Sequence, residues 1–456
     1  MAEWTHKRLG IAEMTPASQS LAIKFFWLSS TQIAQFQIAS TFLVLFLLEI
    51  ISFTELGILF ATQFILTALL DYPTGALGDA IGHKNVLILA YCFYAVSLIF
   101  LIIGNSFMEL IVFAALTAIG RSQESGALQS WFDNNYRITT GEHDSDRKLY
   151  GAFFGQIQAF SGVISGTMFI AGGVIAVVFS RKALFISQLC LVLLALGFIV
   201  FLMKNEEGIE VPQRTLKAYY DRLRGGLQFV ASSRGVLLYF LSSAALFASI
   251  GIWGNLMLLP FYESYTGSDE YTGLLRAIIY TAGIFWGLAG ARLSKQIQNI
   301  YRWLLLSTFY LIIVFFSIVF SFYELFPPPN AFVLTSFVGV ILLFGGLGLS
   351  LSLALQSILR RRLMLELVPD KYRNAVYSLM PTLSVLFSVP LIIFGGAVIA
   401  RFGISGGILL VISLGLIIVP ALGLALYWLS KPEPIKLMPI IAAEGPSKDA
   451  AVKAAG

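Results

Sequence analysis

The segment Gly75-Ala-Leu-Gly-Asp-Ala-Ile-Gly-His-Lys84 lies between two long apolar stretches and decides how the chain is organised. Gly75 permits close packing of helices, and Gly82 can adopt a turn conformation with positive φ. Asp79 can cap a helix N-terminus or pair with a basic residue, and Lys84 anchors the start of the next stretch. The segment therefore predicts a tight crossover between two membrane-spanning helices.

The composition indicates that the rest of the chain lies in a bilayer. Of the 456 residues, 57% are apolar and only 12% are charged, and the mean hydropathy is +0.82. Soluble domains carry about 25% charged residues. With this low charge content, the chain has too little polar surface to coat a water-soluble body of its size. We therefore expect an integral membrane protein whose main contact is the lipid bilayer.

Apolar stretches of about 20 residues, the length that crosses a bilayer, recur along the whole chain. Twelve such stretches can be delimited, at 25–48, 56–78, 85–104, 110–132, 149–178, 183–203, 236–262, 271–291, 303–323, 331–359, 374–400 and 405–430. The fifth is long and glycine-rich, so a tilted or broken helix is an alternative there. We expect an all-α membrane protein with 12 transmembrane helices.

The basic residues predict the orientation of these helices. If both termini are cytoplasmic, 25 of the 30 Lys and Arg residues fall in inner segments and 3 in outer loops. Such a bias is the positive-inside pattern of membrane proteins. We therefore expect cytoplasmic N and C termini, in a plasma (inner) membrane.

The longest polar connection, 204–235, divides the chain into two halves. We expect an N-terminal six-helix bundle over 1–203 and a C-terminal six-helix bundle over 236–430. Within the connection, residues 216–229 are basic and amphipathic, which is typical of a helix on the inner membrane surface. The segment 431–456 is rich in Pro, Ala and Lys and is expected to be a disordered cytoplasmic tail.

This pattern resembles the major facilitator superfamily, whose signature between the second and third helices is Gly-x-x-x-Asp-Arg-x-Gly-Arg-Lys/Arg. The positions that match are Gly75, Asp79, Gly82 and Lys84. Ala80 and His83 stand where the signature has arginines. Segments 125–133 and 366–378 resemble later parts of the family pattern. The resemblance implies two pseudo-symmetric six-helix bundles and a secondary transporter that works by alternating access.

The resemblance also implies a conformational latch on the inner side. In the family, the motif aspartate holds the halves together when the cavity faces outward, and the last motif arginine pairs with an acid that ends the fourth helix. The corresponding residues here are Gly75, Asp79, Gly82, His83, Lys84 and Asp133. A His83–Asp133 contact would tighten on acidification, because histidine titrates near neutrality. The alternative is that His83 is a solvated loop residue.

Ionisable residues inside the predicted spans are costly, at about 2.5–3.5 kcal/mol each. Arg121 and Glu124 lie three residues apart on the fourth helix and share a face. Either they face a cavity, where one binds an anionic group and the other carries a proton, or they form an internal ion pair. Asp71 is a further coupling candidate or a structural link from the second helix to the eleventh. Arg276 is close enough to the outer surface to snorkel.

Polar side chains in the spans indicate where a solute could bind. Thr31, Gln32 and Gln35 lie close together on the first span, where exposure of amides to lipid would be costly. Gln156 on the fifth span is another cavity candidate. On the seventh span, Trp253 offers a stacking surface and Asn255 a polar anchor.

These features favour proton-coupled efflux of amphipathic, drug-like compounds, because an aromatic-rich interior with few charges suits loosely defined organic solutes. An alternative is a nutrient importer or facilitator for a sugar or organic acid. A further alternative is a non-transporting receptor or lipid-handling protein on the same scaffold. The sequence carries no enzyme signature, phosphate loop or clustered metal ligands. We expect no enzyme, no cofactor, no metal and no nucleic-acid partner, but a monomer that binds a small-molecule substrate and protons.

Overall fold

The computed structural model describes residues 9–141, 143–144, 146–204, 224, 227–231, 233–327, 334, 336–368 and 370–431. It describes the backbone but not the side chains of 72–80, 284, 287–295, 365 and 370–381. All regular structure in the described part is helical, as expected where lipid cannot satisfy backbone polar groups. Most of the predicted linker and the predicted tail lie outside the described residues.

The described residues of the first half of the chain form eight helices. They are α2 (Pro16–Ser40), α3 (Leu43–Leu48), α4 (Phe53–Ile81), α5 (His83–Ile103), α6 (Phe107–Glu124), α7 (Ala127–Thr140), α8 (Lys148–Val178) and α9 (Arg181–Leu202). Local signals set several of their starts. The Thr15 hydroxyl caps α2 ahead of Pro16, and Ser106 and Glu109 form a capping box at the start of α6, so the first amides of both helices have acceptors.

In the second half, π-helical turns join α-helices at two places in the described part. Its elements are α11 (Arg234–Ile252), η1 (Trp253–Met257), α12 (Leu258–Thr266), α13 (Asp269–Gln296), α14 (Ile300–Phe309), η2 (Tyr310–Phe315), α15 (Phe316–Leu325), α16 (Phe337–Leu367) and α17 (Asp370–Leu429). α17 is divided at Gly403, whose φ of 69° and ψ of −169° are not helical. This break separates the eleventh and twelfth predicted spans.

Two predicted spans differ from the structure in their continuity. The span predicted over 110–132 is broken between α6 and α7, because Gly126 adopts a left-handed conformation with φ 71°. The first span is interrupted between α2 and α3. The fifth, for which a break was an alternative, is one continuous helix, α8.

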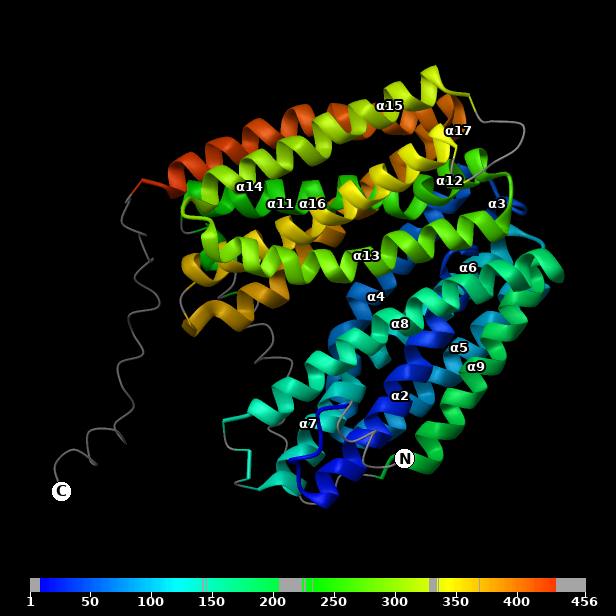
Figure 1. Ribbon diagram of the computed structural model, residues 1–456, viewed down its shortest axis with the longest axis vertical. Helices are drawn as coiled ribbons and strands as arrows, with labels where there is room; N and C mark the ends of the chain where they lie inside the picture. The colour runs from blue at the N-terminus through cyan, green and yellow to red at the C-terminus, as the bar shows by residue number, and fades with distance from the viewer. Residues whose placement is uncertain are drawn as a thin grey trace.

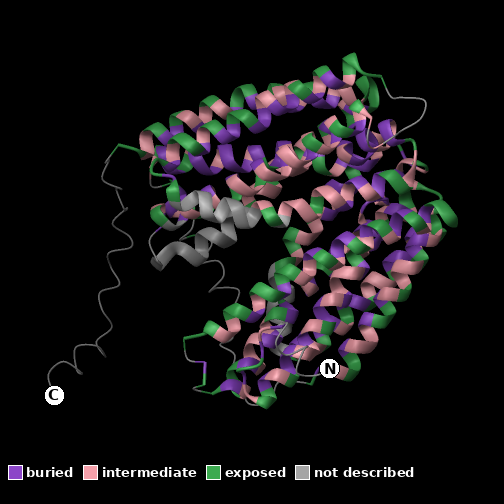
Figure 2. Cartoon of the chain, viewed as in Figure 1, coloured by how far each residue is buried: buried purple, intermediate pink, exposed green. Residues whose placement is uncertain are grey.

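Nine helical segments in the described part are long and apolar enough to cross a membrane. The segment 382–429 counts once among them although Gly403 divides it. α6 carries three charged residues, and the side chains of 284 and 287–295 in α13 lie outside the described set. The division at Gly403 is consistent with the 12 predicted spans. Large apolar side chains such as Leu69, Phe201 and Ile417 are 66%, 86% and 70% exposed, and exposed positions recur along the outside of the helices (Figure 2). Such a surface fits contact with lipid.

The helices form two bundles, α2–α9 and α11–α17, that meet at one end and diverge toward the other (Figure 1). They meet around α3 and α12, and we call this the Arg181 end. We call the other the α7 end. Between the bundles, α4 packs against α17 and α8 packs against α13.

Glycines allow the bundles to approach closely at the Arg181 end. A Cβ on Gly57 of α4 would lie 2.6 Å from the carbonyl oxygen of Ile392 in α17. A Cβ on Gly273 of α13 would lie 2.8 Å from the carbonyl oxygen of Phe169 in α8. Any side chain would therefore separate these backbones. Each interface pairs the second span of one bundle with the fifth span of the other, so the two interfaces are equivalent, as expected of structural repeats.

Candidate functional site

A cavity of about 260 Å³ lies between the two bundles. Its wall combines side chains of α2, α4, α5, α6 and α9 with those of η1, α12 and α13. Polar residues from both bundles line it, including Gln35, Gln63, Arg121, Gln188, Asn255 and Arg276. Most of the remaining lining is apolar, including Phe36, Phe60, Phe64 and Phe113. A concave, mainly apolar site with a few polar groups is typical of small-molecule binding.

Arg121 projects into this cavity from the last turn of α6. Its guanidinium carbon lies 5.3 Å from the centre of the Phe36 ring, a distance typical of a cation–π contact. Among the residues that the structure describes, the Arg121 side chain forms no ion pair and no hydrogen bond. The ion pair with Glu124, one of the two sequence interpretations, is therefore absent from this conformation.

Arg276 reaches the same cavity from α13 in the other bundle. Its guanidinium carbon lies 5.7 Å from the centre of the Phe169 ring. Its Nε is buried and has no hydrogen-bond partner in the described part of the chain. Arg276 also lines an adjoining cavity of about 450 Å³ that includes Gln158 and Tyr280. It therefore points between the bundles, and the snorkelling predicted for it is not observed.

Glu124 accepts hydrogen bonds from three side chains instead of pairing with Arg121. The Gln32 amide lies 2.7 Å from Oε1, the Tyr91 hydroxyl 3.2 Å from Oε1, and the Tyr94 hydroxyl 2.6 Å from Oε2. A Cβ on Gly120 would lie 2.8 Å from the Tyr94 ring, so this glycine lets α5 approach α6. Tyr94 also lines the cavity, and it connects Glu124 to the space where a solute would bind.

The polar residues predicted from the first span have separate places in the structure. Gln35 lines the cavity, whereas Gln32 binds Glu124. Thr31 is buried and donates its hydroxyl to the Leu28 carbonyl at 2.9 Å. One helical face therefore supplies both a cavity residue and a partner for the buried acid.

The cavity candidates from the other spans also lie in different surroundings. Asn255, in the π-helical turn η1, lines the cavity, and its amide donates to the Gly251 carbonyl of α11 at 2.8 Å. Trp253, two residues earlier, is buried against Phe261 and Phe316, outside this cavity. Gln156 is exposed on α8 and does not line it. π-Helical turns often occur at functional sites, and here the turn aims Asn255 inward while Trp253 packs into the bundle.

Sequence reasoning did not identify Gln63 and Gln188 as cavity residues. Each is an amide inside an apolar span, the same signal that identified Gln35 on the first span. Asp71, named as a coupling candidate, lies exposed on α4 and is not part of the cavity lining.

The structure describes only some of the residues of the predicted latch. Gly75 and Asp79 lie among the residues whose side chains are outside the described set. Gly82 has φ 85°, which confirms the expected turn conformation before α5. His83 is buried, contrary to the solvated alternative, and the Lys84 ammonium donates to the Val200 carbonyl of α9 at 2.8 Å.

Asp133 pairs with arginines and not with His83 in this conformation. It lies 3.2 Å from Arg137, one turn later on α7, and 3.1 Å from Arg147 at the start of α8. Both partners belong to the same end of the first bundle, and both supply a permanent charge. The predicted His83–Asp133 contact is therefore not formed in this conformation, in which the bundles diverge at the α7 end.

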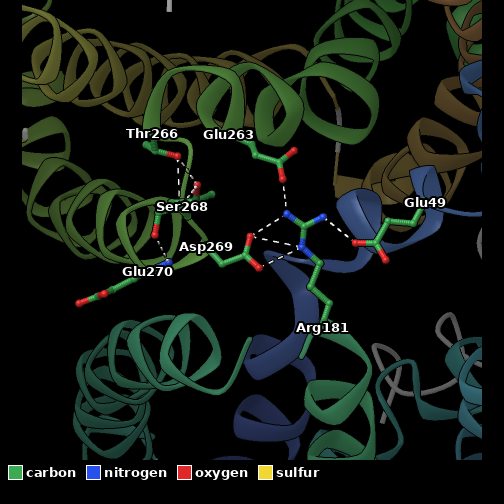
Figure 3. Close-up of polar contacts among 8 residues, drawn as sticks. Glu49, Arg181, Glu263, Thr266, Ser268, Asp269 and Glu270 are labelled. Atoms are coloured by element: carbon green, nitrogen blue, oxygen red, sulfur yellow. Dashed lines mark hydrogen bonds and ion pairs between the residues drawn. The ribbon is translucent and has the colours of Figure 1, made fainter. Parts of the chain in front are cut away.

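At the Arg181 end, one arginine joins the two bundles through three carboxylates (Figure 3). Arg181 begins α9 and binds Glu49, after α3 in its own bundle, at 2.8 Å. From the second bundle, Asp269 at the start of α13 lies 2.7 Å away, and Glu263 of α12 also binds the guanidinium. One sequence signal could have identified this site. The connection after the seventh span is acidic, whereas the predicted outer loops hold few basic residues that could pair with it. These bonds close the cavity at this end.

Two helical bundles, a cavity lined by both of them and ion pairs across one end define a membrane transporter of small solutes. The Major Facilitator Superfamily model matches residues 25–380, and the chain belongs to that family.

Solved structures with the same fold include three transporters. The nucleoside transporter NupG has a TM-score of 0.70 at 13% identity, covering 91% of this chain and 100% of that one. An auto-inhibited POT family peptide transporter has a TM-score of 0.69 at 13% identity, covering 91% and 97%. A D-xylose-proton symporter has a TM-score of 0.59 at 14% identity, covering 92% and 97%. No curated protein sequence matches the chain.

Proposed function

We propose that this transporter is a proton-coupled secondary transporter that binds one small organic solute in the 260 Å³ cavity and works by alternating access. The observation that carries the proposal is that both bundles form the wall of the cavity, which includes Arg121 from one bundle and Arg276 from the other. A site built by both halves changes its access when the halves rock against each other.

The contacts at the two ends support alternating access. Arg181 and the glycine interfaces hold the bundles together at one end, while the bundles diverge at the other (Figure 1). With the predicted orientation, the α7 end faces the cytoplasm, so this conformation faces inward. Opening the Arg181 end would require the pairs with Glu263 and Asp269 to break.

The sequence latch belongs to the opposite conformation. We propose that segment 75–84 holds the α7 ends together when the Arg181 end is open, and that Asp133 then exchanges an arginine for His83. Because histidine gains its charge on acidification, this contact would make transport depend on pH. An unchanged pH profile of transport in His83→Arg would refute the contact.

Glu124 is the proposed proton carrier. It is an acid within the membrane region whose three described hydrogen-bond donors, from Gln32, Tyr91 and Tyr94, are all uncharged. Protonation would remove the charge that these donors stabilise. Since Tyr94 also lines the cavity, the protonation of Glu124 and the occupancy of the cavity affect the same side chain. Asp71 is the second candidate carrier.

Reconstitution in liposomes tests the coupling. An imposed pH gradient with a trapped pH-sensitive dye reports solute-dependent proton movement across a panel of organic solutes. In Glu124→Gln, we expect proton movement to cease while exchange of labelled solute continues. Glu109→Gln, on the exposed first turn of the same helix, is the matched control. Solute exchange with no proton movement in the unmodified protein would refute proton coupling and leave a facilitator.

The direction we propose is export of amphipathic solutes, supported by the apolar and aromatic lining. Import of an organic-acid nutrient is the second candidate, and the two cavity arginines favour it. Solute uptake into inside-out vesicles whose lumen is more acidic than the medium would indicate export by proton antiport. Uptake into right-side-out vesicles with protons moving in the same direction would indicate import.

A further inference from the structure

We infer that the cavity binds the anionic group of its solute between Arg121 and Arg276, so that the substrates are small organic anions, carboxylates or phosphates, with an apolar body. The inference rests on the proposed function only in taking this cavity as the solute site.

The two guanidiniums have no anionic partner in the described part of the chain. Both line the same cavity, and neither forms an ion pair with a described carboxylate. Nε of Arg276 is buried and lacks any hydrogen-bond partner there. Buried polar groups are nearly always satisfied, and an exception calls for an unseen partner. An anion in the cavity supplies that partner.

Charge balance points the same way. A charged side chain in the membrane interior costs about 2.5–3.5 kcal/mol, and pairing reduces this cost. The acid closest to Arg121 along the helix, Glu124, is already bound to Gln32, Tyr91 and Tyr94. The cavity therefore carries two positive charges whose counter-charge is best supplied by a ligand.

The surroundings of the two arginines suit recognition of a carboxylate or phosphate. Phe36 and Phe169 each contact one guanidinium through the ring, which holds the side chain without occupying the hydrogen-bonding edge. That edge presents a planar fork of N–H groups matching two oxygens of an anion. Around the fork, Phe60, Phe64 and Phe113 offer apolar surface for the body of the solute.

The contribution of one arginine from each bundle adds a mechanical consequence. Arg121 belongs to α6 of the first bundle and Arg276 to α13 of the second. An anion that touches both guanidiniums bridges the halves and offsets the repulsion between two like charges that face one cavity. Without an anion that repulsion is not offset, so an anion favours conformations in which the halves close around it.

The test uses four benzene derivatives of similar size and different charge, which are benzoate, phenyl phosphate, benzamide and benzylamine. Binding to the purified full-length protein in detergent is measured by calorimetry. We expect the two anions to bind at least tenfold more tightly than benzamide, and benzylamine not to bind. Arg121→Gln and Arg276→Gln should each reduce anion affinity at least tenfold and leave benzamide unchanged. Arg121→Lys and Arg276→Lys keep the charge and should retain part of the affinity.

Arg401→Gln is the matched control, because Arg401 also contacts a ring, that of Phe402 at 5.4 Å, but does not line the cavity. Thermal unfolding and elution volume confirm that each variant is folded. Equal binding of anions and benzamide, anion affinity unchanged in both Arg→Gln variants, or no anion binding at all would overturn the inference. Calorimetry requires no gradient, so anion binding without solute-dependent proton movement in liposomes would refute the proposed coupling alone. Solute-dependent proton movement without a preference for anions in binding would refute the anion site alone.

Discussion

Gly173 of α8 and Gly273 of α13 touch across the interface between the two bundles, where a Cβ on Gly273 would lie 3.2 Å from the Cα of Gly173. The contact lies close to Arg181 along α8 and α9 and close to Asp269 along α13. Close glycine packing and ion pairs therefore close the same end of the transporter. The first is steric and independent of salt, whereas the second is electrostatic.

Replacing Gly273 with Leu is expected to open the Arg181 end, because the new side chain has no room beside the Phe169 carbonyl and Gly173. In a background without Cys92 and Cys190, Ser40→Cys places a thiol on the cavity lining. A membrane-impermeant maleimide applied from the Arg181 side should label it several-fold faster in the Gly273→Leu variant. Gly155→Leu, a site on α8 with nothing within 4 Å, should leave the rate unchanged. Equal labelling in both variants would contradict a steric closure.

Arg181→Gln should open the same end by removing the charge that joins the bundles. Hydrogen bonds to charged groups contribute about 1.5–3 kcal/mol each, so loss of the bonds to Glu263 and Asp269 should shift the conformational equilibrium at least tenfold. The same labelling assay measures this shift. Lys182→Gln, at the exposed neighbouring position, serves as the control. If Arg181→Gln labels as slowly as the unmodified protein, the ion pairs are dispensable for closure.

Tyr94→Phe tests the connection between the cavity and Glu124. The substitution keeps the ring against Gly120 and removes only the hydroxyl, which lies 2.6 Å from the carboxylate. We expect the number of protons moved per solute to fall, while the affinity for the solute changes little. Tyr91→Phe removes the longer bond of 3.2 Å and should have the smaller effect. A proton-to-solute ratio that Tyr94→Phe leaves intact would exclude this connection.

Asp144 is expected to make stability depend on pH. Burial raises the pKa of its carboxyl, but the amides of Tyr150 and Leu149 and the hydroxyl of Tyr136 lower that pKa more, to a value below the ordinary 3.8. A lowered pKa means stability that is complete above 3.8 and lost as the pH falls through the folded-state value.

Asp144→Asn should therefore lower the free energy of unfolding by about 1–3 kcal/mol near neutral pH. It should also flatten the fall in stability below pH 3.8, measured by thermal unfolding in detergent. Asp146→Asn, which removes an exposed pair with Lys148, is the control and should change little. Parallel pH profiles for Asp144→Asn and the unmodified protein would show that the Asp144 carboxylate does not stabilise the turn before α8.

Local patterns predicted most of the fold. Hydropathy located the spans because a bilayer demands about 20 apolar residues per helix, and Gly82 was predicted to turn because only glycine adopts positive φ without cost. The break at Gly126 was missed, since hydropathy continues through it and a single glycine inside a helical pattern is often tolerated.

The sequence by itself determined most of the helical spans and the acids and bases that fall within them, because both follow from local composition. Only the tertiary structure decided their partners. Arg121 and Glu124 share a helix face, yet Glu124 binds Tyr91 and Tyr94 of α5 because Gly120 lets the two helices meet. Arg276 lines the same cavity as Arg121 because packing of the two bundles, and not spacing along the chain, brings α13 and α6 to its wall.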